Sequence, residues 1–141
     1  MGFNGIAHVQ LTVSDMERSA AFYRPLFELL EMVVLIDTDT YLYGIGSRTG
    51  LAISPIDPAH AGARFDQRRP GLHHVCLRAR SREDVDRFHD LMGQLGATIV
   101  HPPQEDDFAP GYYSVLVEDP DGIRLEANHV PGKGHLETKK T

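Results

Sequence analysis

An internal repeat is the feature of this chain that most limits its fold. Residues 8–34 (HVQLTVSDMERSAAFYRPLFELLEMVV) align without a gap with residues 74–100 (HVCLRARSREDVDRFHDLMGQLGATIV). Because a repeat of this length is a unit of supersecondary structure, the chain is expected to contain two related modules. Seven aligned pairs are identical, five of them apolar as a common core pattern requires: His8/His74, Val9/Val75, Leu11/Leu77, Glu17/Glu83, Phe22/Phe88, Leu29/Leu95 and Val34/Val100.

Length and charge exclude several classes of partner. The chain has 141 residues, which is the size of one domain. Its net charge of −6 argues against a nucleic-acid partner, because neutralising phosphates requires a basic face. No apolar run approaches the roughly 20 residues of a spanning helix, and no export signal is visible, so we expect no membrane partner and a cytoplasmic location. The single cysteine, Cys76, excludes an internal disulfide and fits that compartment.

The first copy predicts a strand, a helix and three further strands. Apolar and polar residues alternate over 6–13, which is typical of a half-buried strand. Ser14 and Glu17 have the spacing of a capping box and predict the start of a helix. Pro25 is expected to kink or end that helix. Glycine-punctuated strands are expected over 32–37, 41–46 and 51–55.

The second copy predicts the same order of elements. We expect a strand over 73–79, a helix capped by Ser81 that runs to about Gly93, and strands over 98–100, 112–117 and 123–128. Asp119-Pro120-Asp121-Gly122 has the composition of a turn. The predicted fold is α+β, with two tandem βαβββ modules that form a curved mixed sheet around a concave cavity. Residues 1–141 are treated as one domain, with modules over 4–55 and 72–130, a linker over 56–71 and a flexible tail over 131–141.

Strand parity predicts which side chains share the face that the helices leave uncovered. If each helix covers the apolar face of its strands, polar side chains from both copies converge on the opposite, concave face, which is a default ligand site. His73 has the parity of the packed face and is interpreted as structural. The residues predicted on the uncovered face are His8, Gln10, Thr12, His74, Arg78, Tyr112, Ser114, Arg124 and Glu126.

These motifs resemble those of the vicinal oxygen chelate superfamily. The resemblance rests on the paired modules, on HVQLTV and HVCLRA at the first strands, and on EDPDGIRLE at the end of the second module; it covers about residues 4–130. The superfamily includes glyoxalase I, methylmalonyl-CoA epimerase, extradiol dioxygenases, fosfomycin-resistance thiol transferases and bleomycin-binding proteins. The resemblance implies a divalent metal ion (Fe, Mn, Ni and Zn are not distinguished) held by His8, His74 and Glu126.

Several positions depart from the patterns of the named branches. The fourth ligand position of glyoxalase I and of the epimerase falls at Ala52, which has no donor atom. Leu116 stands where extradiol dioxygenases carry a catalytic tyrosine, although Tyr112 shares its face. Gln10 replaces the threonine of the fosfomycin transferases. The resemblance therefore implies a metalloenzyme outside these branches.

The preferred function is Lewis-acid polarisation of vicinal oxygens on a small substrate, with isomerase, lyase or addition chemistry. The alternatives are an Fe(II) extradiol-type dioxygenase and a non-catalytic binding protein of the bleomycin-resistance type. A homodimer is expected, with each site built within one chain or between swapped chains. The candidate substrate-binding residues are Tyr112, Ser114, Arg124 and Gln10.

Overall fold

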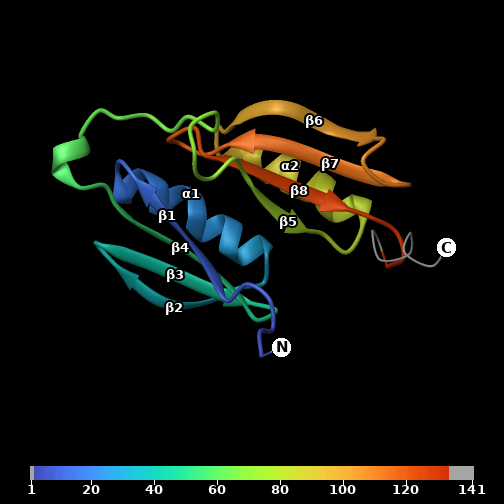
Figure 1. Cartoon of the computed structure of the whole chain (residues 1–141), viewed down its shortest axis with the longest axis horizontal. Coiled ribbons are helices and arrows are strands. Elements are labelled where there is room, and N and C mark those ends of the chain that lie inside the picture. Colours follow the sequence, from blue (N-terminus) through green and yellow to red (C-terminus); the bar gives the residue numbers. More distant parts are fainter. Residues whose placement is uncertain (1, 134–141) are drawn as a thin grey trace. The chain divides into compact units, whose positions relative to one another are not determined.

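The computed structural model of the chain describes residues 2–133. It divides into two compact units between Arg64 and Phe65, and each unit is described by itself (Figure 1). The tail expected over 131–141 lies, from residue 134 onward, outside the described residues.

Unit 1 is built on a four-stranded mixed sheet in the order β1-β4-β3-β2. Strand β1 runs parallel to β4, while the β4–β3 and β3–β2 pairs are antiparallel. A single 3-10 turn, Pro58–His60, follows the sheet. The elements are β1 His8–Val13, α1 Met16–Leu29, β2 Val33–Thr38, β3 Tyr41–Gly46 and β4 Thr49–Pro55.

Unit 2 repeats this plan with the sheet order β5-β8-β7-β6. Its parallel pair is β5–β8, and its other two pairs are antiparallel. The predicted α+β fold with two βαβββ modules is therefore confirmed, and the strands form one four-stranded sheet in each module. The elements are β5 Val75–Arg78, α2 Arg82–Gln94, β6 Thr98–Asp106, β7 Tyr112–Glu118 and β8 Arg124–His129.

The start of α1 differs from the capping box expected from the sequence. The N-cap is Asp15, whose carboxylate accepts a hydrogen bond from the Arg18 backbone N–H at 3.0 Å. An anionic cap also interacts favourably with the positive end of the helix dipole. The hydroxyl of Ser14 instead accepts from the Arg18 guanidinium. Pro25 lies inside α1 and does not end it, because the fully buried Leu26 and Phe27 hold the following turn against the sheet.

In unit 2 the expected cap of α2 is confirmed, and the largest difference from the predicted strands is at the end of β6. Ser81 is the N-cap and accepts from the Asp84 backbone N–H. Strand β6 continues to Asp106, well past the end predicted at Val100. Its two prolines, at 102 and 103, are tolerated because β6 is an edge strand with one row of backbone groups unpaired.

Strand β5 begins only at Val75, so the interpretation of His73 as a packed strand residue was wrong. The side chain of His73 is exposed and lies in irregular chain before the strand. Side chains alternate between the two faces only within a regular strand. The predicted strand began at residue 73, two residues before the observed start of β5.

Each helix packs against the apolar face of its own sheet, with α1 against β4 and β2 and α2 against β6, β7 and β8. The opposite face of each sheet is therefore the one on which polar residues gather. None of the helices in the described range 2–133 is both long and apolar enough to cross a membrane. The largest fully buried side chains are Tyr23, Phe27, Leu26, Leu42, Ile53 and Val13 in unit 1, and Phe88, Met92, Leu125, Val85, Val115 and Val117 in unit 2.

A tight turn sets the register of β8 after β7. The side chain of the buried Asp119 accepts hydrogen bonds from the backbone N–H groups of Asp121 and Ile123. Gly122 adopts a φ of +84°, a conformation that costs glycine little and other residues more. The turn thereby fixes where β8 begins, and with it the face on which residue 126 lies.

Candidate functional site

The cross-strand register of unit 2 aligns side chains on the uncovered face. Cys76 on β5 is the register partner of Glu126 on β8, and Glu126 in turn is the partner of Leu116 on β7. Register partners share a face of a sheet. His74 lies one residue before β5, next to this row.

Both oxygens of the Glu126 carboxylate face a specific partner. Oε2 lies 3.1 Å from Nε2 of His74. Oε1 accepts a hydrogen bond from the phenol of Tyr112. The Glu126 side chain is only 13% exposed, so water competes little for these contacts. The sequence-based prediction of a His74–Glu126 pair therefore corresponds to two side chains that meet in this unit.

Tyr112 is a hydrogen-bond donor in this cluster. Burial of the phenol, and next the hydrogen bond to the Glu126 carboxylate, hold the pKa of Tyr112 well above its ordinary value. A contact with Asn128 acts in the opposite direction and is outweighed. The phenol consequently keeps its proton and orients the carboxylate.

Cys76 lies beside the same carboxylate but is not an activated thiol. Neighbouring side chains desolvate the sulfur, and the charge of Glu126 disfavours a second anion next to it. Together these effects raise the pKa of Cys76 to about 12. Since the thiolate is the reactive form, Cys76 is a poor nucleophile near neutral pH.

His73 contacts the candidate site through its ring, which the parity of the sequence did not indicate. Its Nδ1 lies 2.8 Å from Nδ1 of His74, and the two rings meet edge to face with centroids 5.0 Å apart. The only signal in the sequence is that the two histidines are adjacent. Adjacent residues point to opposite faces in a strand, and the contact exists because this segment is not a strand.

In unit 1, His8 and Gln10 occupy the uncovered face of β1. The His8 ring lies edge-on to the ring of Tyr43, with centroids 6.3 Å apart. Gln10 donates to the hydroxyl of Ser54 at 2.9 Å and accepts from the phenol of Tyr41 at 3.3 Å. Gln10 is therefore held within its own sheet.

Ala52 is the register partner of both Gln10 and Tyr43. Its side chain is fully buried although it belongs to the polar face, because larger neighbours flank it on both sides. The position offers no metal-binding atom.

Ser114 and Arg124 share the face of Glu126 in unit 2 but have different surroundings. Ser114 is buried and is the register partner of Asn128. The Nε of Arg124 lies 3.6 Å from a carboxylate oxygen of Glu118, its cross-strand partner, and the Arg124 side chain is 22% exposed. The Arg124 side chain thus lies near the Glu118 carboxylate at the end of β7.

Within residues 2–133, no group of three or more histidine, cysteine, aspartate or glutamate side chains forms a ready metal cage. The structure brings together His74 and Glu126 in unit 2, while His8 belongs to unit 1. An imidazole nitrogen and a carboxylate oxygen that face each other are a donor pair suited to a divalent transition metal.

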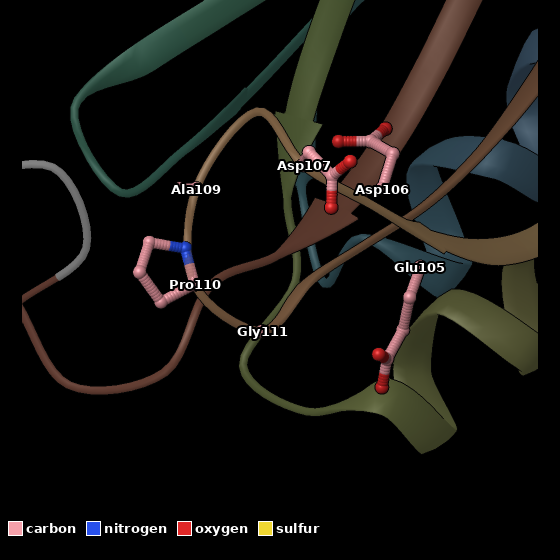
Figure 2. Close-up of a pocket in the computed structure, with 6 residues that line it drawn as sticks. All are labelled: Glu105, Asp106, Asp107, Ala109, Pro110 and Gly111. Carbon is pink, nitrogen blue, oxygen red and sulfur yellow. The ribbon is translucent and has the colours of Figure 1, made fainter.

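A separate hollow of about 350 Å³ lies at the hairpin between β6 and β7 (Figure 2). It is lined by the acidic residues Glu105, Asp106 and Asp107 together with Ala109, Pro110 and Gly111. Figure 2 shows the Glu105 side chain directed away from those of Asp106 and Asp107. Glu105 pairs with Arg82 of α2, and Asp106 accepts from the Phe108 backbone N–H. Glu105 is thus engaged by the helix of the same unit, and Asp106 by the backbone of the hairpin.

Three comparisons place these features among known proteins. The uncharacterized protein YqjT of Bacillus subtilis (strain 168) is 27% identical over 123 residues, which cover 84% of this chain and 94% of that protein. A glyoxylase/bleomycin resistance protein/dioxygenase domain from Frankia sp. EAN1pec is similar in structure, with a TM-score of 0.71, 29% identity, and coverage of 91% of this chain and 98% of that one.

A glyoxalase/bleomycin resistance protein from Albidiferax ferrireducens T118 has a TM-score of 0.74 and 24% identity, over 89% of this chain and 98% of its own. At that identity the likeness shows the fold alone. The model of the Glyoxalase/Bleomycin resistance protein/Dioxygenase superfamily matches residues 5–127, from before β1 into β8. The paired modules, their sheet order and this match agree, and the chain belongs to the Glyoxalase/Bleomycin resistance protein/Dioxygenase superfamily.

Proposed function

We propose that this chain is a divalent-metal-dependent enzyme of the glyoxalase type that acts on a small substrate with vicinal oxygens. The observation that carries the proposal is the His74–Glu126 pair, with Nε2 and Oε2 3.1 Å apart and the second carboxylate oxygen bound by Tyr112. The family is named in part after two kinds of enzyme, glyoxalases and dioxygenases. The reaction class proposed here is isomerase, lyase or addition chemistry.

The residues present fit a metal ion of this kind. His74 and Glu126 supply one nitrogen and one oxygen donor. The proposed third ligand is the imidazole of His8 on β1. A metal-bound carboxylate commonly has its other oxygen hydrogen-bonded, as Tyr112 does here. A divalent ion bound by this set acts as a Lewis acid that polarises substrate oxygens. Tyr112 keeps the Glu126 carboxylate oriented, and Gln10, Ser114 and Arg124 are the proposed substrate contacts.

Metal binding provides the test of the proposal. Protein purified without chelators should hold about one metal per chain, and His74→Ala and Glu126→Gln should each weaken binding about 100-fold or more, because a lost ligand costs more than a lost supporting contact. Isothermal titration with Zn²⁺, Mn²⁺ and Ni²⁺ measures this effect. His101→Ala is the matched control, since that ring contacts the Pro102 carbonyl on β6 and should leave the affinity unchanged.

A content below about 0.2 metal per chain that reconstitution does not raise would contradict the proposal, because a preformed ligand set should fill when metal is supplied. Persistent binding of a planar ligand by the double variant His8→Ala, His74→Ala would then identify a non-catalytic binding protein of the bleomycin-resistance type.

An Fe(II) extradiol-type dioxygenase is a second candidate, because the phenol of Tyr112 does lie against Glu126 although residue 116 is leucine. The raised pKa of Tyr112 makes that phenol a donor more readily than a base. Oxygen uptake with catechols on anaerobically iron-loaded protein tests this candidate, and an absence of uptake removes it.

The proposed assembly is a homodimer, and mixed variants can locate its sites. The variants His8→Ala and Glu126→Gln are each expected to lose metal binding. The two proteins are unfolded, mixed and refolded together. If His8 joins the His74–Glu126 pair of a second copy, one site of each mixed dimer carries neither change, and metal binding returns. If each site is built within one chain, every site carries a change and binding stays lost.

A further inference from the structure

We propose that His73 is a positioning residue for His74, and that the two rings share one proton whose location sets the tautomer of His74. The inference rests on the proposed metal role of His74. It starts from the contact between the two Nδ1 atoms, 2.8 Å apart, on rings that meet edge to face.

The distance between these nitrogens allows a single hydrogen between them. Two N–H groups aimed at each other at 2.8 Å would bring their hydrogens into collision, and two bare nitrogens would oppose their lone pairs. One ring therefore donates from Nδ1 and the other accepts. A neutral imidazole carries one hydrogen, so the donor ring has a bare Nε2 and the acceptor ring carries its hydrogen on Nε2.

Glu126 selects between the two arrangements in the metal-free protein. Its Oε2 lies 3.1 Å from Nε2 of His74, and a carboxylate oxygen only accepts hydrogen bonds. With both rings neutral, the arrangement that satisfies it has the hydrogen on Nε2 of His74, so His74 accepts at Nδ1 and His73 donates from Nδ1. The metal-free chain thus runs His73 N–H to His74, and His74 N–H to Glu126.

A metal ligand at Nε2 of His74 requires the opposite arrangement. That nitrogen must be bare, so the hydrogen of His74 moves to Nδ1, where it is donated to His73. The proton on Nε2 of His74 goes to solvent, the shared proton shifts from Nδ1 of His73 to Nδ1 of His74, and the exposed His73 ring takes up one proton from water at Nε2. One proton leaves and one arrives, so the pair changes tautomer without a net change in charge.

His73 therefore serves His74 in both states, first as a donor and then as an acceptor. A hydrogen-bond acceptor behind a ligand imidazole fixes the plane of its ring and raises the basicity of the ligating nitrogen, and loss of such a partner typically weakens metal binding 10- to 100-fold. Tyr112 gives the matching support to the Glu126 carboxylate.

The tautomers are read directly from two-bond ¹⁵N–¹H correlation spectra of the histidine-labelled full chain. In metal-free protein we expect His74 protonated at Nε2 and His73 at Nδ1. Addition of Zn²⁺ should move the His74 hydrogen to Nδ1 and the His73 hydrogen to Nε2. Finding both rings protonated at Nε2 in the metal-free protein, with no shared hydrogen, overturns the proposal.

Variants at position 73 supply a second readout. His73→Phe should weaken Zn²⁺ binding by about tenfold, while His73→Gln, whose amide both donates and accepts, should stay within about threefold of wild type. His101→Phe replaces a ring elsewhere in unit 2 and should leave the affinity within about twofold. Unchanged backbone spectra establish that each variant is folded. Equal Zn²⁺ affinity for wild type and His73→Phe overturns the positioning role.

The failure of the proposed function gives a different result. If wild-type protein does not bind Zn²⁺ and the His74→Ala variant behaves identically, the metal role is wrong. The metal-free spectra then still decide whether His73 and His74 share a hydrogen, because that measurement involves no metal.

Discussion

The two modules have the same strand register but fill the polar faces of their sheets differently. In unit 1, Gln10 of β1 pairs with Ala52 of β4; in unit 2, Cys76 of β5 pairs with Glu126 of β8. Gln10 and Cys76 are aligned in the repeat, so Ala52 occupies the position of Glu126. The carboxylate of the candidate site thus has no counterpart in the first module.

Aromatic side chains stand on that side of unit 1 instead. Tyr43 is the cross-strand partner of Ala52, where unit 2 has Leu116 beside Glu126. The Tyr43 ring lies over Gly50, where an added Cβ would overlap it. The two histidines differ accordingly, since His8 meets an aromatic ring edge and His74 meets a carboxylate and a second imidazole. The repeat preserves backbone and core, and the polar faces have separate chemistry.

The largest expected effect tests how far the cores are equivalent. Phe22 and Phe88 are an identical pair of the repeat, both nearly fully buried under their helices. Truncation of either to alanine should cost about 3–5 kcal/mol in the free energy of unfolding, through lost burial and a residual cavity. Urea unfolding followed by circular dichroism measures this cost. A difference of more than about 2 kcal/mol between the two variants would break the equivalence of the cores.

A smaller effect is expected where Tyr43 covers Gly50. Gly50→Ala should destabilise the protein by about 1–3 kcal/mol, because the added methyl group collides with the ring. Tyr43→Leu gives unit 1 the residue that unit 2 has at the corresponding position, and in that background the same change should cost less than about 1 kcal/mol. Urea unfolding measures the loss of stability in each background. If Gly50→Ala lowers the free energy of unfolding equally in both, the Tyr43 ring is not the cause of the destabilisation.

The smallest expected effect concerns the thiol beside Glu126. Because the pKa of Cys76 is raised to about 12, little thiolate is present at pH 8, and alkylation should be slow and should still accelerate above pH 9. The matched control is Gln10→Cys in a Cys76→Ala background, which moves the thiol to the aligned position beside Ala52.

The moved thiol should react about tenfold faster or more at pH 8, since no carboxylate opposes its ionisation there. Rates with a small alkylating reagent, followed by mass spectrometry, provide the measurement. Comparable rates at the two positions would show that the polar faces of the modules differ less than their side chains suggest.

The sequence predicted most of the fold because its strongest signals are local. The alternation in β1, the cap at Ser81 and the turn at Asp119–Gly122 each depend on neighbouring residues. The predictions failed where a nonlocal contact overrode the local pattern. Buried packing of Leu26 and Phe27 carried α1 past Pro25, and pairing at a sheet edge extended β6 through two prolines.

The candidate site was predicted in part for the same reason. Parity placed Tyr112 and Glu126 on one face, and the repeat with the family resemblance singled out His74. The contact of Tyr112 with the carboxylate required the actual path of the β7–β8 hairpin. The contact of His73 with His74 was missed because the segment before β5 is irregular, and no periodic rule describes side-chain directions there.

The sequence by itself determined two βαβββ modules and the residue types that each presents on its polar face, since hydrophobic periodicity and capping operate over a few residues. Tertiary structure decided which of those side chains meet. The parallel pairing of β5 with β8 joins His74 to a carboxylate from a strand about fifty residues away. Such pairing depends on the packing of a whole sheet against its helix, which no short stretch of sequence contains.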